Sequence, residues 1–183
     1  MERSKELLNL ILDRRSCRRF LSQPLDRPTL AAILEAGRYA PSANNKQLTR
    51  FYVITDRKLL DSLSQVVSSK LENFAGRDCT YGAPVLILVT NRYDHNCALQ
   101  DAACAMENMM LAACVMGVGS CWINQPYHLD GDPDLRALLA PMGLTQEERI
   151  CCSLALGLPE GPLFPGRKEH AGNQVIWPEF GED

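Results

Sequence analysis

The fold of this chain is decided by its clearest strand, which reads Pro84-Val85-Leu86-Ile87-Leu88-Val89-Thr90. A continuous apolar run of this length is typical of a strand in the middle of a sheet, where both faces are buried. Polar segments at Gly76–Gly82 and Asn91–Asn96 are predicted to form loops on either side of it. Three more segments are predicted to contain strands, namely Phe51–Thr55, Gly117–Ile123 and Cys151–Leu156.

Helical patterns surround these strands. The first helix is predicted from a row of apolar residues on one face, made by Leu7, Leu8, Ile11 and Leu12. Asp26 can cap a second helix that has Pro28 in its first turn, and Pro41 ends that helix. Further helices are predicted at Lys58–Leu71, Ala98–Met116 and Asp134–Leu139. Because helices and strands mix without regular alternation, the predicted fold class is α+β.

The helix predicted at Ala98–Met116 is the most apolar in the chain. Its alanines and methionines cover more than one face, so it must be buried on most sides. A partner subunit would bury it naturally in so small a chain, although a helix enclosed by its own subunit fits the pattern too. We favour a dimer, in which the Pro/Gly-rich tail around Val175-Ile176-Trp177 lies across the other subunit.

Length and charge narrow the class of protein. The 183 residues are expected to form a single domain, 1–183, or one lobe of an obligate dimer. A net charge of −3 argues against a general nucleic-acid binder. Charged residues interrupt Met1–Phe20, so no signal peptide is expected, and the apolar stretch Ala98–Gly117 is too polar for a membrane span. We therefore expect a cytoplasmic protein.

Several cofactor and metal motifs are missing. The chain has no Gly-x-Gly-x-x-Gly after a strand and no phosphate-binding P-loop motif. It has eight cysteines but no Cys-x-x-Cys, so we expect no metal site and assign most thiols to packing. His95, His128 and His170 show no catalytic or metal spacing and are interpreted as loop or surface residues.

Two polar motifs carry the functional signal. The first, Arg14-Arg15-Ser16-Cys17-Arg18-Arg19-Phe20, gathers four guanidinium groups and a hydroxyl at a helix end. The second, Ala40-Pro41-Ser42-Ala43-Asn44-Asn45-Lys46-Gln47, is a run of small and amide residues before an apolar strand. Such an inventory suits a phosphate at one end and a polar heterocycle at the other. The second motif alone also fits a helix-ending turn.

The ordered set of motifs resembles the FMN-dependent nitroreductase family. After the two motifs come the strand opened by Pro84, then Gly117-x-Gly119-x-Cys121-Trp122-Ile123, Leu156-Gly157-Leu158-Pro159 and Arg167-Lys168. The resemblance implies a central, mostly antiparallel sheet flanked by helices, in an intertwined homodimer that binds FMN. It also implies that NADH or NADPH donates hydride and that a small electron-poor acceptor, such as a nitroaromatic or a quinone, is reduced in ping-pong order.

The resemblance also implies a role for each cofactor-binding residue. Arg14, Arg167 and Lys168 would hold the phosphate. Ser16 and the main chain at Arg15 would hydrogen-bond the ribityl chain or the ring. Arg18 would lie beside the N1–O2 edge. Pro41, Ser42 and Ala43 would contact the flavin of the other subunit, with Asn45 and Gln47 as further donors and acceptors. Trp122, Ile123 and Asn124 would lie beside N5, where a main-chain N–H donates. No catalytic side chain is expected, because the flavin carries the chemistry.

This chain departs from its relatives at two places, and other functions stay open. Relatives often have glycine near Asn124 or Gln125, which leaves the N5 donor open, and Gln-Pro-Trp where this chain has Gln47-Leu48-Thr49. One alternative is a specialised relative of the dehalogenase or flavin-destructase type, with a lid at Glu72–Tyr81 or Leu129–Pro133. Another is an FMN-binding redox sensor or storage module. A thiol-based metal protein rests on the cysteine count alone.

Overall fold

The computed structural model describes residues 2–163, 166 and 172–178. Within them a four-stranded sheet has the order β1-β2-β4-β3, with every neighbouring pair antiparallel. The strands are β1 (Arg50–Ile54), β2 (Val85–Arg92), β3 (Gly119–Ile123) and β4 (Glu148–Gly157). The helices are α1 (Glu2–Asp13), α2 (Arg27–Arg38), α3 (Arg57–Lys70), α4 (Ala98–Val115), α5 (Gln125–His128) and α6 (Pro133–Leu139). The chain therefore has an α+β fold.

The central strands β2 and β4 are buried along nearly their whole length. Their register shifts between Val89 and Thr90, where Val89 pairs with Cys152 and Thr90 with Ile150. Cys151 is the extra residue of this β-bulge. β2 also runs two residues beyond the predicted strand, so the loop predicted from Asn91 begins too early. The cause is tertiary pairing, because Asn91 faces Arg149 on β4.

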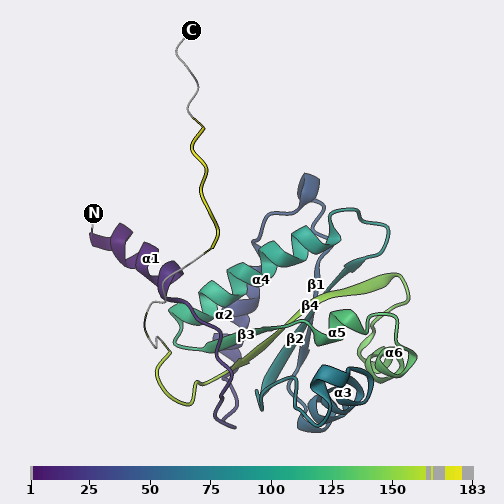
Figure 1. Ribbon diagram of the computed structural model, residues 1–183. Coiled ribbons are helices and arrows are strands. Elements are labelled where there is room, and N and C mark those ends of the chain that lie inside the picture. The colour runs from purple at the N-terminus through teal and green to yellow at the C-terminus, as the bar shows by residue number, and fades with distance from the viewer. Residues whose placement is uncertain (1, 164–165, 167–171, 179–183) are drawn as a thin grey trace.

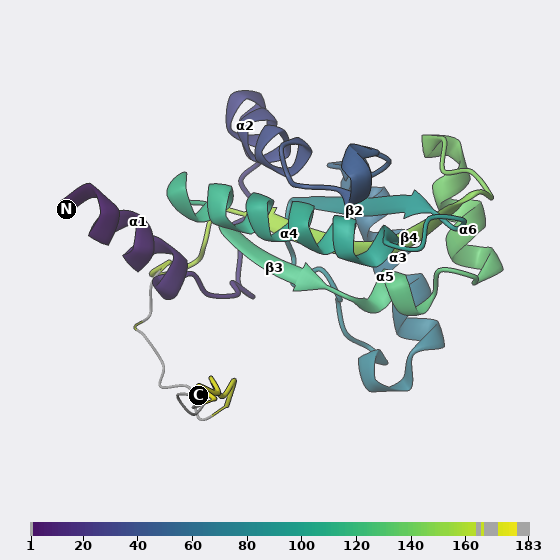
Figure 2. The same cartoon turned by 90° about the horizontal axis from the view of Figure 1, so that it is seen from above.

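Helices cover both faces of the sheet (Figures 1 and 2). On one face α4 lies on β2 and β4, and α2 packs on α4, with Ile33, Met106 and Met109 fully buried between them. On the other face α3 and α6 pack together over a second core that includes Leu63 and Leu135. Both faces of the central strands are therefore dry, as the continuous apolar run of β2 predicts.

Local signals explain where α2 begins and how closely it approaches α4. The Asp26 carboxylate accepts a 2.8 Å hydrogen bond from the Thr29 amide, which confirms the predicted cap. A Cβ at Gly37 would lie 2.8 Å from Cγ of Met109, so a glycine is required where the two helices touch.

The apolar face of α1 is not covered by the rest of the protomer. α1 projects from the body of the molecule (Figures 1 and 2), and Leu7, Leu8, Ile11 and Leu12 are 57%, 55%, 51% and 44% exposed. In the tail, Val175, Ile176 and Trp177 are even more exposed. An apolar helix face of this size in water calls for a partner surface. The structure's described helices include none long and apolar enough to cross a membrane.

Candidate functional site

The first motif runs along the edge of β3. The Cys17 amide donates to the Ser120 carbonyl at 2.8 Å, and Ser16 forms a parallel bridge with Ser120. This approach requires glycine at position 119, because a Cβ there would lie 2.8 Å from the Cys17 sulfur. Pairing with β3 therefore leaves Ser16 exposed at the sheet edge, between the end of α1 and the rest of β3.

The two arginines at the end of α1 have different environments. The Arg15 side chain donates to the Leu12 and Arg14 carbonyls at 2.9 and 2.8 Å, which caps the helix. Its Nη2 atom is buried and has no hydrogen-bond partner among the residues the structure describes. Arg14 is half-buried and lies 3.6 Å from Glu107 on α4. A buried guanidinium nitrogen without an acceptor can receive an anionic or carbonyl oxygen.

Arg18 lies over an aromatic ring from a distant loop. Its guanidinium carbon is 5.9 Å from the centroid of Tyr81, a residue with φ of 56°. The loop is shaped by Asp78, whose carboxylate accepts hydrogen bonds from Thr80 and from the Gly82 amide. These bonds outweigh the effect of burial and keep the pKa of Asp78 below its ordinary value. Asp78 is therefore ionised at neutral pH and fixes the turn that presents Tyr81 to Arg18.

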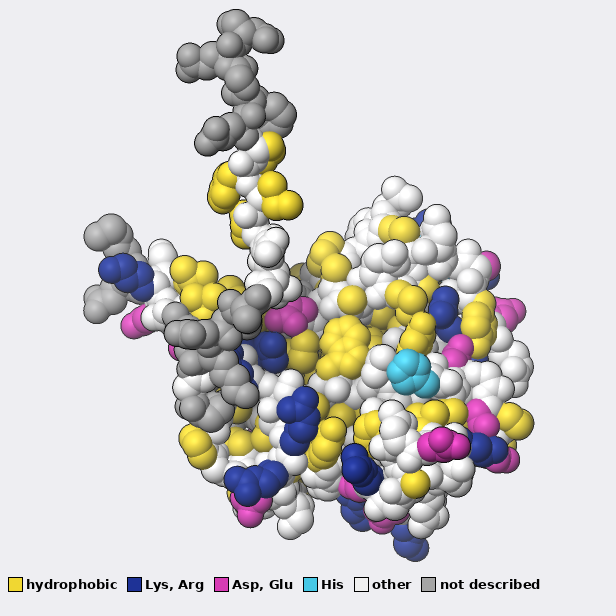
Figure 3. Space-filling view, viewed as in Figure 1, with side chains coloured by type: hydrophobic (Ala, Val, Ile, Leu, Met, Phe, Trp, Pro, Cys, Tyr) yellow, Lys and Arg dark blue, Asp and Glu magenta, His cyan; other side chains and the backbone are white. Residues whose placement is uncertain are grey.

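The end of β3 extends the same surface. Trp122 is 37% exposed, and its indole N–H donates to the Asn124 side chain at 3.2 Å. Asn124 in turn lies 3.3 Å from Nε2 of His128 on α5, a short helix that the sequence did not predict. Ile123 is buried in the core, so only its backbone is available to a ligand. In Figure 3, basic side chains lie between α1 and a hydrophobic patch near α5.

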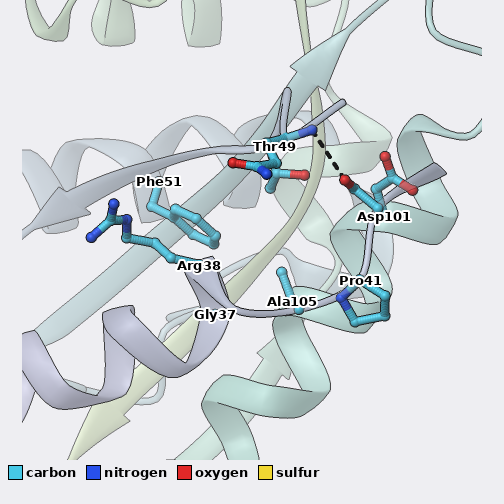
Figure 4. A pocket seen from close by; sticks show the side chains of 10 residues that line it. Gly37, Arg38, Pro41, Thr49, Phe51, Asp101 and Ala105 are labelled. Carbon is cyan, nitrogen blue, oxygen red and sulfur yellow. Dashed lines mark hydrogen bonds between the residues drawn. The ribbon is translucent and has the colours of Figure 1, made fainter. Parts of the chain in front are cut away.

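The second motif forms an exposed loop after α2, which we call the Ser42–Gln47 loop. Asn44, Asn45 and Gln47 all have positive φ, at 53°, 54° and 54°. The loop lies on α4, where the Ala43 amide donates to Asp101 at 2.9 Å. A cavity of about 190 Å³ beside it is lined by residues that include Pro41, Thr49, Phe51 and Asp101 (Figure 4).

The two motifs occupy different faces of α4. Arg14 contacts Glu107, whereas Ala43 contacts Asp101, six residues earlier. Six residues correspond to about 9 Å along a helix and about 240° around it. The structure thus forms two groups. Pairing with β3 brings the segment with Arg14, Arg15, Ser16 and Arg18 to the strand that ends in Trp122, Ile123 and Asn124, whereas the loop with Pro41, Ser42, Ala43, Asn45 and Gln47 is bonded to α4 at Asp101. Arg167 and Lys168 lie outside the described residues.

Several residues of these surfaces were not identified from the sequence. Tyr81 and Asp78 lie in a segment that the sequence marked only as a possible lid. Asp101 is one of two acids, with Glu107, in an otherwise apolar helix, and this is the one signal that could have been used. His95 was interpreted as a loop or surface residue. It does lie in a loop, but it is not on the surface. It is only 5% exposed because its ring packs against Asp101, with Nε2 2.9 Å from the carboxylate.

The cysteines are all free, and five of the eight are buried. Burial raises the pKa of the Cys121 thiol, despite the nearby Arg18, so this sulfur is neutral at ordinary pH. Across the described residues, no group of three or more histidines, cysteines or acids is placed to hold a metal ion. Packing is the role that the structure supports for the five buried sulfurs.

Comparison with known proteins identifies a family and several relatives of this chain. A family model described as "Nitroreductase family" matches residues 11–158. A crystal structure of a nitroreductase with bound FMN from Bacteroides fragilis is 33% identical, with a TM-score of 0.86, over 93% of this chain and 98% of that chain. A protein of Archaeoglobus fulgidus with the provisional name NADH dehydrogenase/NAD(P)H nitroreductase is 28% identical over 158 residues, which cover 85% of this chain and 87% of that protein.

A further structure shares the fold at lower identity. Oxidized iodotyrosine deiodinase, bound to FMN and 3-iodo-L-tyrosine, has a TM-score of 0.76 and 22% identity over 95% of this chain and 100% of that chain. At this identity the likeness concerns the fold alone.

Proposed function

The chain belongs to the nitroreductase family, and from this premise we propose that it is a homodimeric, FMN-dependent oxidoreductase. NADH or NADPH is the proposed hydride donor, and a small electron-poor compound such as a nitroaromatic or a quinone is the proposed acceptor. The observation that carries the proposal is the pairing of the segment that holds Arg14, Ser16 and Arg18 with the edge of β3 at Ser120, two residues before Trp122. An FMN-bound relative at 33% identity supports the choice of cofactor.

The residues at the end of α1 fit the groups of FMN. A phosphate monoester carries a charge of about −1.5 to −2 at neutral pH and is best held by guanidinium forks. Arg14 offers a half-buried guanidinium, and Arg15 a buried Nη2 without a partner among the described residues. The exposed Ser16 hydroxyl can donate to or accept from a ribityl hydroxyl. Arg167 and Lys168 are proposed to complete the phosphate site.

Arg18 is proposed to tune the cofactor. When bound, FMN supplies hydride-transfer chemistry, and negative charge then develops at the N1–O2 edge of its ring. A guanidinium beside that edge stabilises the charge, and Tyr81 restricts where the guanidinium can go. At the opposite edge, the backbone after Ile123 is proposed to supply the N–H for N5. Trp122 and Asn124 hold that segment through their mutual hydrogen bond.

A second subunit is proposed to complete each site. The Ser42–Gln47 loop lies on another face of α4 from Arg14, so one protomer does not join its two motifs around a single ligand. A twofold arrangement would bring the loop of one subunit to the flavin of the other. The exposed apolar face of α1 and the exposed tail at Val175–Trp177 supply surfaces for such an interface.

An absorbance experiment tests the proposal. The purified protein is mixed with FMN, passed through gel filtration, and then treated with NADH or NADPH without oxygen. Flavin bands that elute with a dimer and bleach on addition of the nicotinamide are the expected result. Bound flavin that does not bleach with either nicotinamide would favour a redox sensor or storage module instead. Absence of bound flavin would contradict the proposal.

A specialised family member is the other candidate. The fold likeness to iodotyrosine deiodinase keeps reductive dehalogenation open as an acceptor reaction, with the same donor and cofactor. The two activities separate in steady-state assays with a nitroaromatic, a quinone and a halogenated phenol as acceptors. A higher kcat/KM for the halogenated phenol than for the nitroaromatic and the quinone would favour a specialised dehalogenase.

A further inference from the structure

The Ser42–Gln47 loop is held in a backbone conformation that needs support. Non-glycine residues rarely adopt positive φ, and they keep it only where the surrounding structure fixes them. Asn44 and Asn45 tolerate this region better than most residues, but Gln47 has no such advantage. Three such residues within four positions therefore require an anchor.

Most hydrogen bonds of the loop are internal. The Asn45 amide donates to the Ser42 carbonyl at 2.9 Å, and the Gln47 amide donates to the Ser42 hydroxyl at 3.0 Å. The Gln47 side chain also donates to the Asn45 side chain at 2.8 Å. These bonds give the loop its shape, but they do not fix its place on the molecule.

One bond connects the loop to the body. The Ala43 amide donates to Oδ1 of Asp101 on α4 at 2.9 Å. In the described part of the chain, no other hydrogen bond ties the Ser42–Gln47 loop to another element. The cavity of about 190 Å³ beside the loop reaches Asp101 and Ala105, so packing there is incomplete (Figure 4). Asp101 is therefore the main constraint on the position of the loop.

Asp101 is itself fixed from the opposite side. Its side chain is 5% exposed, and His95, with a side chain 2% exposed, contacts its second oxygen through Nε2 at 2.9 Å. Because the carboxylate accepts, the hydrogen of this bond is on Nε2. Nδ1 of His95 is buried without a hydrogen-bond partner among the described residues, so no competing bond turns the ring. A carboxylate buried to this degree requires both partners.

We propose that Asp101, oriented by His95, is a positioning residue that sets the Ser42–Gln47 loop for binding the flavin held mainly by the partner subunit. This inference rests on the proposed function, because it assigns the loop to an FMN site. Asp101 touches neither cofactor nor substrate in this proposal. It acts through the Ala43 amide and decides whether Pro41, Ser42 and Ala43 are in place when the cofactor arrives.

The test begins with two substitutions of Asp101. Asp101→Ala removes the acceptor, and we expect the FMN dissociation constant, measured by quenching of flavin fluorescence, to rise about 10- to 100-fold. Asp101→Asn keeps an oxygen for the Ala43 amide and places an N–H toward His95. It is expected to bind FMN within about threefold of the unmodified protein, because the bond to the Ala43 amide is kept and the bond to His95 re-forms once the ring proton moves from Nε2 to Nδ1.

Hydrogen–deuterium exchange of the cofactor-free protein gives a readout that does not depend on FMN. Asp101→Ala is expected to speed exchange in peptides that cover residues 41–48, and Asp101→Asn is not. A matched control is Asp132→Ala, which removes a carboxylate that accepts the Asp134 and Leu135 amides at the start of α6. The control should lower the melting temperature but leave exchange at residues 41–48 and the FMN dissociation constant unchanged.

A second variant removes the other half of the bond and leaves the buried carboxylate in place. Ala43→Pro lacks the amide hydrogen, and the extended backbone of Ser42, with φ −134° and ψ 151°, suits a following proline. If Asp101 acts through this amide, the double variant Asp101→Ala/Ala43→Pro binds FMN no more weakly than the weaker single variant. Fully additive losses would overturn the proposal.

The outcomes separate this inference from the proposed function. Unmodified protein that binds FMN, together with an Asp101→Ala variant of equal affinity and equal exchange, would overturn the positioning role alone. Unmodified protein that binds no FMN would overturn the proposed function and, with it, this role for Asp101.

Discussion

The guanidinium carbon of Arg18 lies 5.9 Å from the centre of the Tyr81 ring, which joins the first motif to a loop more than sixty residues away. A contact of this kind stabilises an exposed pair by about 0.5–1 kcal/mol. The loop holding Tyr81 is anchored through Asp78, so the ring has little freedom to follow the arginine. The positive charge of Arg18, which is proposed to lie beside the flavin, is therefore held at a defined place.

The first prediction concerns the reduction potential of the bound flavin. Arg18→Ala should lower the potential, because the developing negative charge loses its cation, and Arg18→Lys should retain most of it. Tyr81→Leu should lower the potential by a smaller amount, whereas Tyr81→Phe, which keeps the ring face, should match the unmodified protein. Equilibration with a reference dye measures all four. An unchanged potential in Arg18→Ala would remove the assigned role of Arg18.

The second prediction concerns the phosphate. Arg14→Ala should raise the FMN dissociation constant about 10- to 100-fold, the usual loss for a hydrogen bond to a charged group. Glu107→Gln should leave binding unchanged or tighten it, because Glu107 competes for the same guanidinium. Arg57→Ala, on α3 and paired with Asp61, serves as the control. Equal affinity of Arg14→Ala and this control would argue against a phosphate contact.

The third prediction uses the close approach of the first motif to β3. Gly119→Ala places a Cβ 2.8 Å from the sulfur and 2.9 Å from Cβ of Cys17. It should destabilise the fold by about 1–3 kcal/mol and weaken FMN binding, since the segment bearing Ser16 must move. Adding Cys17→Gly should restore both. Gly131→Ala, with no atom near its new Cβ, should change neither thermal unfolding nor binding.

The sequence predicted an element of the fold correctly where residues within that element determine its structure. The apolar run of β2 predicts a central strand, and Asp26 with Pro28 predicts the start of α2 correctly. Errors arose where a distant partner decides the outcome. β2 continues to Arg92, beyond the predicted end at Thr90, because β4 pairs with it.

The candidate site divides in the same way. Arg14, Ser16 and Arg18 were found from their own motif, since four arginines within six residues are unusual. Tyr81 and Asp101 were not, because each matters only through a residue far along the chain. A local sequence pattern cannot predict that Arg18 lies over the Tyr81 ring or that Asp101 accepts a hydrogen bond from the Ala43 amide.

The fourth prediction concerns subunit association. Leu8 and Ile11 are more than half exposed on α1. The double variant Leu8→Lys/Ile11→Lys should convert a dimer into monomers in sedimentation velocity and should lose FMN with it, if the site needs both subunits. Leu21→Lys, which changes an exposed leucine outside α1, is the control. A dimer that survives both changes would place the interface elsewhere.

The fifth prediction concerns stability at low pH. Burial would raise the pKa of Glu148, but hydrogen bonds from Thr145, Thr90 and Tyr52 outweigh it and hold the pKa below the ordinary 4.5. Glu148 therefore stabilises the fold above pH 4.5, and this contribution is lost as the pH falls through the lower folded-state value. Glu148→Gln should be less stable by about 1–3 kcal/mol at pH 7.

Urea unfolding at several pH values tests this. The difference in unfolding free energy between the unmodified protein and Glu148→Gln should shrink steadily below pH 4.5. A difference that is constant down to pH 3 would mean that the charge of Glu148 does not contribute.

The place of β4 in the sheet has a consequence for how the chain is made. Among the described residues β4 is the last strand in sequence, yet it lies between β2 and β3 and contributes to both core clusters. The nascent chain on the ribosome therefore holds two strands without their shared neighbour until residue 157 has been synthesised. During that interval the edges of β2 and β3 that later pair with β4 are unpaired, and chaperones that bind extended apolar segments can bind them. Native pairing is late and non-local, which favours slow, whole-chain folding.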